Sequence, residues 1–307
     1  RKFGLNPKLI FALLYFSSLF CAPLAVPNSF PVVSCPTPCT CSYRERLVNC
    51  SNRSLRKIPV IPPWVAILSL KNNKIGASAV KDHTFRNLPN LQELDISDND
   101  LRVLNISFHG SPLLHTLRLE SCSLESIPYI DPTGRPNVTT LALSHNAITR
   151  IEGLSLWPAL LILNLSFNSI RRIHSNTFVK QSNLTQLYLH KNNISSVDEH
   201  AFAGLLSLET LSLGRNKIGI GRHGLKHFAP SAVLASEQQG DPCNGNLRKL
   251  RFLDLSRNRI SRIEPLTFNG MCQLYTLLLH DNRISRLLDA SFYSLKALTT
   301  LRMDDNR

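Results

Sequence analysis

One pattern of eleven residues, LxxLxLxxNxL, recurs along most of the chain and limits what this sequence can fold into. Ten copies align between Val65 and Arg307, and the tenth is cut short by the end of the sequence. The Asn advances by 22 to 26 residues per copy, apart from one step of 42 residues. A period of this length indicates a solenoid, in which each repeat packs only against its neighbours. The Asn positions, with Cys122 replacing Asn in the third copy, are Asn73, Asn99, Cys122, Asn146, Asn168, Asn192, Asn216, Asn258, Asn282 and Asn306.

The alternation within each copy predicts the secondary structure. In LxL, both Leu side chains point to one face of a strand and the residue between them points to the other. Strands of successive copies are expected to stack in parallel, and the wider segments behind them bend the stack into a horseshoe. We therefore predict an α/β fold class: a repeat solenoid over residues 64–307, with a parallel β-sheet on the concave face and irregular or 3-10 structure on the convex side.

Two further kinds of residue recur with the period, and we interpret both as structural. The Asn is expected to be buried at the bend after the strand, where its amide can satisfy backbone groups. Cys122 at the same place predicts a free structural thiol. Aromatic side chains at fixed offsets after the Asn predict a stack in the core rather than a binding site. They are Phe85, Phe178, Phe202, Phe228, Phe268 and Phe292.

The N-terminus predicts entry into the secretory pathway. Basic residues precede an apolar run from Leu9 to about Ala22, and small residues follow it. This order is typical of a cleaved signal peptide, here at residues 1–25, with a linker at residues 26–34. An uncleaved anchor is the alternative, although the run is shorter than the about 20 apolar residues that a membrane span needs. Because the first residue is Arg rather than Met, we expect a fragment of a longer chain.

Four cysteines within sixteen residues follow the linker. In an oxidising compartment such a cluster forms two disulfides, whereas zinc binding is the alternative in a reducing one. The sequence favours disulfides and leaves the three possible pairings open. Cys35, Cys39, Cys41 and Cys50 belong to a predicted Cys-rich cap at residues 35–63, which would cover the apolar end of the first repeat.

Six N-x-S/T sequons predict surface glycosylation. Together with the signal peptide and the cysteines, they indicate an extracellular or cell-surface location. They begin at Asn52, Asn105, Asn137, Asn164, Asn183 and Asn193.

Charge and catalytic motifs limit the function classes. The sequence carries 35 Lys and Arg against 21 Asp and Glu, a net charge of +14, which makes an anionic partner worth testing. No G-x-S-x-G, H-E-x-x-H or P-loop motif is present in the sequence. His223 and His227 form one H-x3-H pair, which supplies too few ligands for zinc. We predict that the protein is not an enzyme and that it uses no metal and no cofactor.

Four arginines form the candidate anion site. Arg150 and Arg172 lie four residues after their Asn in adjacent copies, as do Arg262 and Arg286 in a later pair. Stacked guanidinium groups suit sulfates, so heparan sulfate is one possible ligand. The interpretation that we favour is a solvated, charged edge of the solenoid. No nucleic-acid partner is expected for a secreted chain.

The long step between the seventh and eighth copies predicts an insertion at about residues 229–247. Its Gly, Pro, Ser and Gln content indicates a loop. Cys243 in this loop can pair with Cys272 only if their Cα atoms lie close enough, which the sequence leaves open.

The outward positions beside LxL supply a candidate binding surface. They read Glu93, Asp95 and Ser97 in the second copy and mostly Ser, Thr or Ala in the fourth. From the sixth to the ninth copy they include aromatic and apolar side chains, which are enriched in protein interfaces. A glycan on Asn164 in the fifth copy would screen the N-terminal side of this surface. The predicted partner-binding residues are Tyr188, His190, Phe252, Asp254, Leu278 and His280.

The repeat resembles the leucine-rich repeat, and the spacing C-x3-C-x-C-x8-C resembles the N-terminal cap of secreted and cell-surface proteins that contain it. The resemblance of the cap implies that Cys35 pairs with Cys41 and Cys39 with Cys50. The family implies a binding protein whose partner is a protein ectodomain or a secreted protein.

Within this superfamily, residues 127–148 and 263–306 resemble the ectodomains of the leucine-rich-repeat and immunoglobulin-domain (LRIG) family. That resemblance implies a single-pass receptor that regulates growth-factor receptor signalling, anchored in the membrane only if a span follows residue 307. Slit-like, Toll-like and hormone-receptor-like ectodomains share the repeat and stay as alternatives, as does a matrix protein that binds heparan sulfate.

Overall fold

The computed structural model describes residues 34–81, 83–132, 136–219, 243, 247–264 and 267–307, and the structural statements below concern these residues. The chain divides into two compact units, residues 1–34 and residues 35–307, and the fold described is that of the second unit. The predicted signal peptide, nearly all of the linker and most of the predicted insertion lie outside the described residues, as do Phe228 and the His223 and His227 pair.

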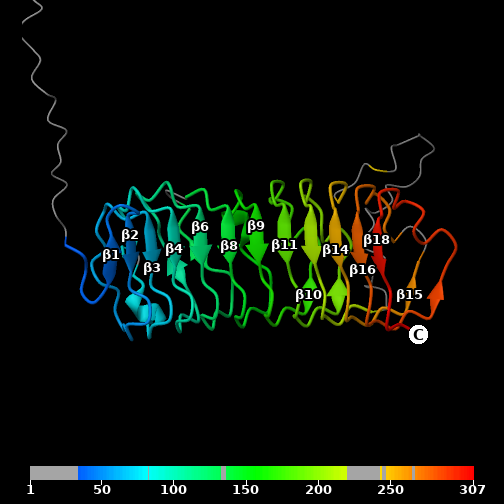
Figure 1. The fold of residues 1–307 in the computed structure, drawn as a ribbon, viewed down its shortest axis with the longest axis horizontal. Coiled ribbons are helices and arrows are strands. Elements are labelled where there is room, and N and C mark those ends of the chain that lie inside the picture. Colours follow the sequence, from blue (N-terminus) through cyan, green and yellow to red (C-terminus); the bar gives the residue numbers. More distant parts are fainter. Residues whose placement is uncertain (1–33, 82, 133–135, 220–242, 244–246, 265–266) are drawn as a thin grey trace, which may run out of the picture. The chain divides into compact units, whose positions relative to one another are not determined.

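The repeats form one sheet of twelve strands, each three residues long, which follow one another in chain order (Figure 1). The first two strands form an antiparallel hairpin, and every later strand pairs in parallel with its predecessor. The strands are β1 (Thr40–Ser42), β2 (Leu47–Asn49), β3 (Ile67–Ser69), β4 (Glu93–Asp95), β6 (Thr116–Arg118), β8 (Thr140–Ala142), β9 (Ile162–Asn164), β11 (Gln186–Tyr188), β13 (Thr210–Ser212), β14 (Phe252–Asp254), β16 (Thr276–Leu278) and β18 (Thr300–Arg302).

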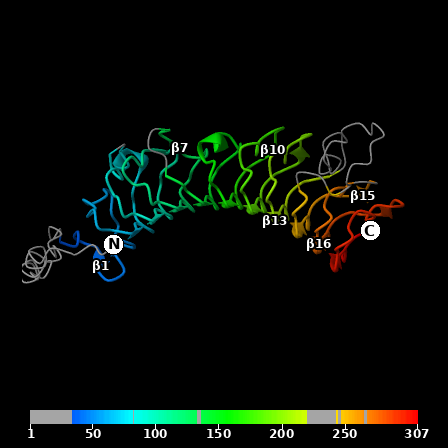
Figure 2. The same cartoon turned by 90° about the horizontal axis from the view of Figure 1, so that it is seen from above.

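The alternation of LxL has the predicted effect on burial. The central Leu of each strand from β3 to β16 is 0% exposed, as is the Leu or Ile two residues later in the LxL motif. Most of the remaining strand residues are partly exposed, and the last strand, β18, has a Leu301 that is 41% exposed. Residues 35–307 curve with the main sheet on the inner side (Figure 2), which confirms the predicted horseshoe with a parallel, concave sheet.

The convex side is built from short elements, as predicted. Three two-stranded parallel pairs lie there together with two 3-10 turns, and no α-helix occurs in the part of the chain that is described. No helix among the described residues is long and apolar enough to cross a membrane. The elements are β5 (Asn105–Ile106) with β7 (Tyr129–Ile130), β10 (Arg172–Ile173) with β12 (Ser196–Val197), β15 (Arg262–Ile263) with β17 (Arg286–Leu287), η2 (Ala77–Ala79) and η3 (Leu154–Leu156).

The Asn of each repeat joins consecutive turns of the solenoid, and we call this column the ladder. Asn168 shows the pattern: its Nδ2 donates to the carbonyls of Leu143, Leu165 and Ser166 at 2.9, 3.1 and 3.2 Å. Its Oδ1 accepts the N–H of Ile148 at 3.0 Å. Each side chain therefore satisfies buried backbone groups of its own repeat and of the repeat before it, as the sequence predicted.

Cys122 fills the ladder position of the third repeat as a buried free thiol, which confirms its predicted role. Its Sγ lies 3.3 Å from the carbonyl of Ile96. The N–H of Leu101 has no Asn oxygen to meet here, and the backbone carbonyl of Cys122 accepts it instead at 2.9 Å. Burial raises the pKa of the Cys122 thiol to about 12, so the group is neutral and inert.

The aromatic stack lies in the core behind the ladder. Phe178 and Phe202 have ring centroids 6.3 Å apart, and the rings of Phe268 and Phe292 are 6.0 Å apart. These pairs confirm the packing role predicted for them. Trp157 is 2% exposed, and its Nε1 donates to the carbonyl of Pro128 at 3.3 Å.

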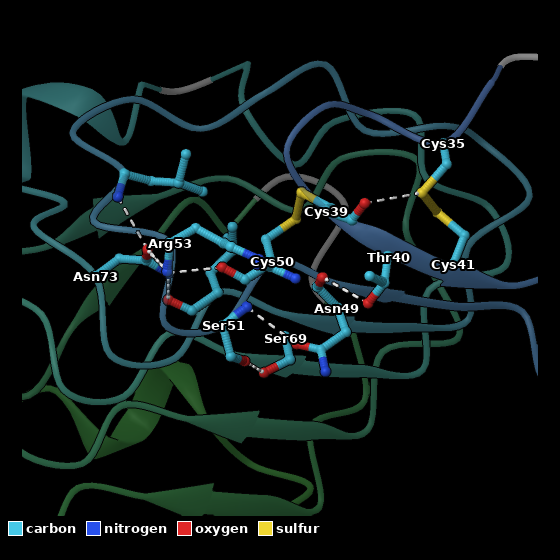
Figure 3. The surroundings of a disulfide bond; sticks show 12 residues. Cys35, Cys39, Thr40, Cys41, Asn49, Cys50, Ser51, Arg53, Ser69 and Asn73 are labelled. Atoms are coloured by element: carbon cyan, nitrogen blue, oxygen red, sulfur yellow. Dashed lines mark hydrogen bonds between the residues drawn. A yellow bond between two sulfur atoms is a disulfide. The ribbon is translucent and has the colours of Figure 1, made fainter.

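The N-terminal cap closes one end of the core (Figure 3). Disulfides join Cys35 to Cys41 and Cys39 to Cys50, the same pairs that the resemblance of the cap implies. Strand β2 pairs with β3, and its Val48 is 0% exposed, so the hairpin covers the first repeat. A third disulfide joins Cys243 to Cys272, whose Cα atoms are 5.5 Å apart.

Candidate functional site

The six predicted partner-binding residues lie on or next to the concave sheet. Tyr188 and Leu278 end β11 and β16, and Asp254 ends β14, so they share one row across the sheet. Ser212 of β13 lies in this row between Tyr188 and Asp254. Phe252 belongs to a second row, where Thr210 and Thr276 are its neighbours. His190 and His280 follow their strands by two residues, and all six side chains are partly buried.

The centre of this surface is polar. The Ser212 hydroxyl donates to Asp254 Oδ2 at 3.4 Å and lies 3.3 Å from His190 Nδ1. Gly214 leaves room for the carboxylate, because a Cβ at this position would lie 2.5 Å from Asp254 Oδ2. Burial lowers the pKa of His190 below its usual value, against the opposing effect of the Asp254 carboxylate. The hydroxyl lies between the imidazole and the carboxylate, so these three groups do not have the order of a Ser-His-Asp catalytic triad.

The residue just before each ladder position lies where the chain leaves the concave sheet, and we call this column the rim. Every rim residue has a left-handed backbone, with φ between 52° and 58°. This conformation is uncommon for residues other than Gly, Asn and Asp, and it is rarest for bulky side chains. The rim residues are Asn72, Asp98, Ser121, His145, Phe167, Lys191, Arg215, Arg257, Asp281 and Asp305.

Aromatic side chains cluster at the rim of the fourth to sixth repeats. The ring of Phe167 stacks on His145 with centroids 4.0 Å apart and meets His190 edge-on at 5.5 Å. The Lys191 Nζ lies 4.1 Å from the centroid of the Phe167 ring, and Tyr188 lies 6.5 Å from His190. We call these five residues the rim cluster. The repeat imposes the left-handed conformation on every rim residue, so what distinguishes these repeats is a partly exposed aromatic ring at the rim with aromatic and cationic neighbours.

Sequence reasoning found Tyr188 and His190 but missed the other three members of the rim cluster. The prediction considered only the strand positions that flank the buried Leu residues. Reading the residue before each Asn as a separate column would have shown His145, Phe167 and Lys191 in successive repeats. Ser97, which was predicted to belong to the outward surface, is not available there, because it is 1% exposed and its Oγ accepts the N–H of Glu120 in the next repeat.

From the sixth repeat to the tenth, the charge of the rim residues changes from basic to acidic. Lys191 and Arg215 form no ion pair within the described residues, whereas Arg257 is paired with Asp281 at 3.0 Å. In the last repeat, Arg302 holds the pKa of Asp304 at about 2 through a side-chain hydrogen bond. The rim cluster therefore contains one cation, Lys191, and lies near a second, Arg215, and neither is paired with a carboxylate among the described residues.

The predicted glycosylation site Asn164 lies in register with Tyr188, directly beside the rim cluster. Its Oδ1 accepts hydrogen bonds from the Ser166 N–H at 3.1 Å and from the Ser166 hydroxyl at 2.7 Å. Asn193 is partly exposed, and the other four predicted acceptors are exposed. These are Asn52, Asn105, Asn137 and Asn183.

The arginines of the candidate anion site lie on the convex side, and three of the four are paired with carboxylates. Arg172 bonds Asp198 at 2.7 Å and Arg262 bonds Glu264 at 2.6 Å. Arg150 lies 3.6 Å from Glu152, and Arg286 is the register neighbour of Arg262. Ion pairing favours the interpretation of a solvated edge over that of an anion site. No group of three potential metal ligands occurs within the described ranges.

Parts of the chain match two protein families. Residues 63–124, 158–218 and 248–307 match the family described as "Leucine rich repeat", and residues 34–62 match the "Leucine rich repeat N-terminal domain". The second match covers the disulfide-bonded cap, and the first covers most of the main sheet.

Individual relatives point to extracellular repeat proteins. The chain is 31% identical to human "Leucine-rich repeats and immunoglobulin-like domains protein 1" over 80% of its length, which spans 19% of that protein. It is 26% identical to mouse Podocan over 81% of its length and 50% of that protein. A solved complex of Latrophilin 3, Unc5D and FLRT2 contains a chain of the same fold, with a TM-score of 0.65, 23% identity, and coverage of 89% of this chain and 84% of that one.

Proposed function

Because this chain belongs to the leucine-rich repeat family, we propose that it is a non-enzymatic, extracellular or cell-surface protein whose concave face binds another protein. The observation that carries the proposal is the rim cluster, in which the partly exposed ring of Phe167 contacts His145, His190 and Lys191. Cap disulfides support an oxidising compartment. The solved relative is itself a complex with other proteins.

The contact surface combines the rim cluster with the outward residues of the sixth to ninth repeats. Tyr188 belongs to both, and its row continues through Ser212 and Asp254 to Leu278. Aromatic anchors surrounded by polar groups are the usual composition of an interface centre. Lys191 and Arg215 favour a partner surface that brings carboxylates to the rim.

For the partner, we propose the ectodomain of a growth-factor receptor, whose signalling the protein would regulate. The support is the similarity to human leucine-rich repeats and immunoglobulin-like domains protein 1. The chain spans about a fifth of that relative, so this role and a membrane anchor are proposals about a larger molecule.

The test uses the secreted chain and a panel of soluble growth-factor-receptor ectodomains immobilised on a biosensor. At least one ectodomain should bind, and replacing Tyr188, Phe252 and Leu278 by Ser should weaken that binding by about 100-fold or more. Each anchor is expected to contribute on the order of 1–2 kcal/mol, and each 1.4 kcal/mol is tenfold in affinity. Absence of binding to the whole panel would refute the receptor role.

The matched control removes three exposed apolar side chains outside the main sheet. Val103, Leu113 and Val179 are 53%, 50% and 51% exposed, and their replacement by Ser should leave binding unchanged. If the concave variant keeps full affinity, or if both variants lose it equally, the concave face is not the interface. Secretion level and the urea midpoint of each variant show that folding is intact.

A further inference from the structure

A second surface feature lies far from the rim cluster, at the N-terminal end of the convex side. The segment that follows the cap strands and the segment around η2 enclose a hollow of about 610 Å³. In Figure 2 the segment around η2 is cyan. Its volume is in the range of small-ligand sites. Ile58, Ile61 and Leu88 contribute apolar lining, which lowers the local dielectric.

The polar lining of this hollow is basic. Arg56, Lys57, Lys81, His83 and Arg86 all contribute to it, and all five side chains are exposed. Neither Asp nor Glu occurs among the described lining residues. None of these five side chains forms an ion pair within the described part of the chain. Among the residues that the structure describes, four permanent cations therefore line one hollow without a neutralising partner.

The smaller convex hollow near Arg150 provides a comparison within the same molecule. It has a volume of about 350 Å³ and is lined by Arg150, Arg171, Arg172 and His174. Three of its four cationic side chains already have a carboxylate partner: Arg172 and His174 both contact Asp198, at 2.7 and 3.5 Å, and Arg150 lies 3.6 Å from Glu152. The hollow at the cap has the same kind of lining but lacks these internal counter-ions among its described residues.

We propose that the hollow at the cap is a binding site for a sulfated polysaccharide. Arg56 and Arg86 supply planar guanidinium groups that match the oxygens of a sulfate, and Lys57 and Lys81 supply compact charges for a second group. The choice of sulfated polysaccharide rests on the extracellular location in the proposed function, where such chains are the abundant polyanions. The site lies on the opposite side of the solenoid from the concave sheet, so it can be occupied while a protein partner binds.

The experiment measures binding of the secreted chain to a size-defined heparin oligosaccharide by calorimetry and on a heparin column. The variant Arg56→Gln, Lys57→Gln, Lys81→Gln, Arg86→Gln should bind at least about tenfold more weakly, because it loses the four positive charges that would donate hydrogen bonds to sulfate oxygens. Replacing Lys57 and Lys81 by Arg should keep the affinity. Both variants should keep the urea midpoint of the unmodified chain.

A matched variant removes four positive charges elsewhere: Arg150→Gln, Arg172→Gln, Arg262→Gln, Arg286→Gln. It should elute from heparin almost as the unmodified chain does. Equal losses in both variants would mean that net charge alone causes retention, and the proposal would be wrong.

Further arms replace heparin by desulfated heparin, by phosphatidylserine vesicles or by a DNA oligonucleotide. Loss of binding to desulfated heparin supports sulfate recognition, and unchanged binding to it overturns the proposal. Stronger, hollow-dependent binding to the vesicles or the oligonucleotide would also overturn it, in favour of a lipid surface or a nucleic acid. Because no receptor ectodomain is present, failure here leaves the concave-face proposal untouched.

Discussion

The ladder residue and the rim residue before it are neighbours in every repeat, but the structure places them in opposite environments. Asn168 is 7% exposed, and its side chain forms four hydrogen bonds to the backbone. Phe167 lies at the surface with a φ of 55° and contacts His145, His190 and Lys191.

This difference shows how the solenoid separates stability from recognition. The ladder position is Asn in nine of ten repeats because its amide must meet backbone groups in fixed places. The rim position holds Asn, Asp, Ser, His, Phe, Lys and Arg, although its backbone conformation is the same throughout. The turn therefore tolerates almost any side chain there, which leaves the rim available for binding specificity.

The largest effect on stability is expected from Asn168→Ala. This change leaves the buried N–H of Ile148 without an acceptor. It also removes one donor from the carbonyls of Leu143, Leu165 and Ser166, each of which keeps a second donor. An unsatisfied buried N–H costs about 1–3 kcal/mol, and each of the three lost bonds to a carbonyl costs about 0.5–1.5 kcal/mol, so the free energy of unfolding should fall by about 3 kcal/mol or more. Urea unfolding of the secreted protein measures the shift.

The neighbouring change Phe167→Ser is the control, because Ser121 occupies the same position in the third repeat. Loss of aromatic contacts costs about 0.5–1.5 kcal/mol, at the lower end here because Phe167 is partly exposed, and the backbone keeps its left-handed conformation as it does at Ser121. The free energy of unfolding should fall by less than about 1 kcal/mol. Similar losses for Asn168→Ala and Phe167→Ser would remove the distinction between ladder and rim.

A somewhat smaller effect is expected where the ladder meets the cap. Asn73 Nδ2 donates to the carbonyl of Cys50 at 3.0 Å, next to the disulfide with Cys39 (Figure 3). Replacing Cys39 and Cys50 by Ser should cost about 2–3 kcal/mol, because a loop of this size loses its covalent closure. The secretion yield should decrease together with the free energy of unfolding. Unchanged secretion and an unchanged urea midpoint would show that the hairpin holds without its cross-link.

Most of the fold was predictable from the sequence because the ladder and the LxL motif recur with one period. The aromatic stack was predictable only in the repeats where the aromatic residue follows the ladder Asn by a constant number of residues. Phe108 and Trp157 fill the equivalent core space at other offsets, nine and eleven residues after Asn99 and Asn146, and so escaped the pattern. Packing requires a ring in that space and tolerates different chain positions for it.

The binding surface was harder to predict because outward residues follow no period. Tyr188 and Leu278 were found as strand residues, but Phe167 lies in a turn that propensity would assign to Asn or Gly. The hollow at the cap was missed for another reason. Its basic residues come from two separate segments, around Lys57 and around Lys81, whose proximity depends on how the cap folds back.

Cys122→Ala tests the one exception in the ladder. The backbone carbonyl of Cys122 already accepts the N–H of Leu101. The Cys122 side chain therefore satisfies fewer backbone groups than the Asn168 side chain does. We expect a loss of only about 1 kcal/mol in the free energy of unfolding, which is typical of a small buried group. In the folded protein, iodoacetamide at pH 8 should leave Cys122 unmodified, since the thiol is buried and its pKa is about 12. Labelling before addition of urea would contradict this assignment.

The smallest effect concerns pH and the residue that joins the rim cluster to the polar centre of the concave face. Burial lowers the pKa of His190, and Lys191, His145 and Arg215 act in the same direction, while Asp254 opposes them. The unfolded chain therefore binds a proton more readily than the folded chain does. The free energy of unfolding should fall as the pH drops below about 6.5, the ordinary pKa of His, and should stop falling once the pH is below the pKa of His190 in the folded chain. His190→Gln should reduce the difference in urea midpoint between pH 7.5 and pH 5. An equal difference in both proteins would show that His190 titrates as an ordinary surface residue, and that the rim cluster is more open to water than its ring contacts indicate.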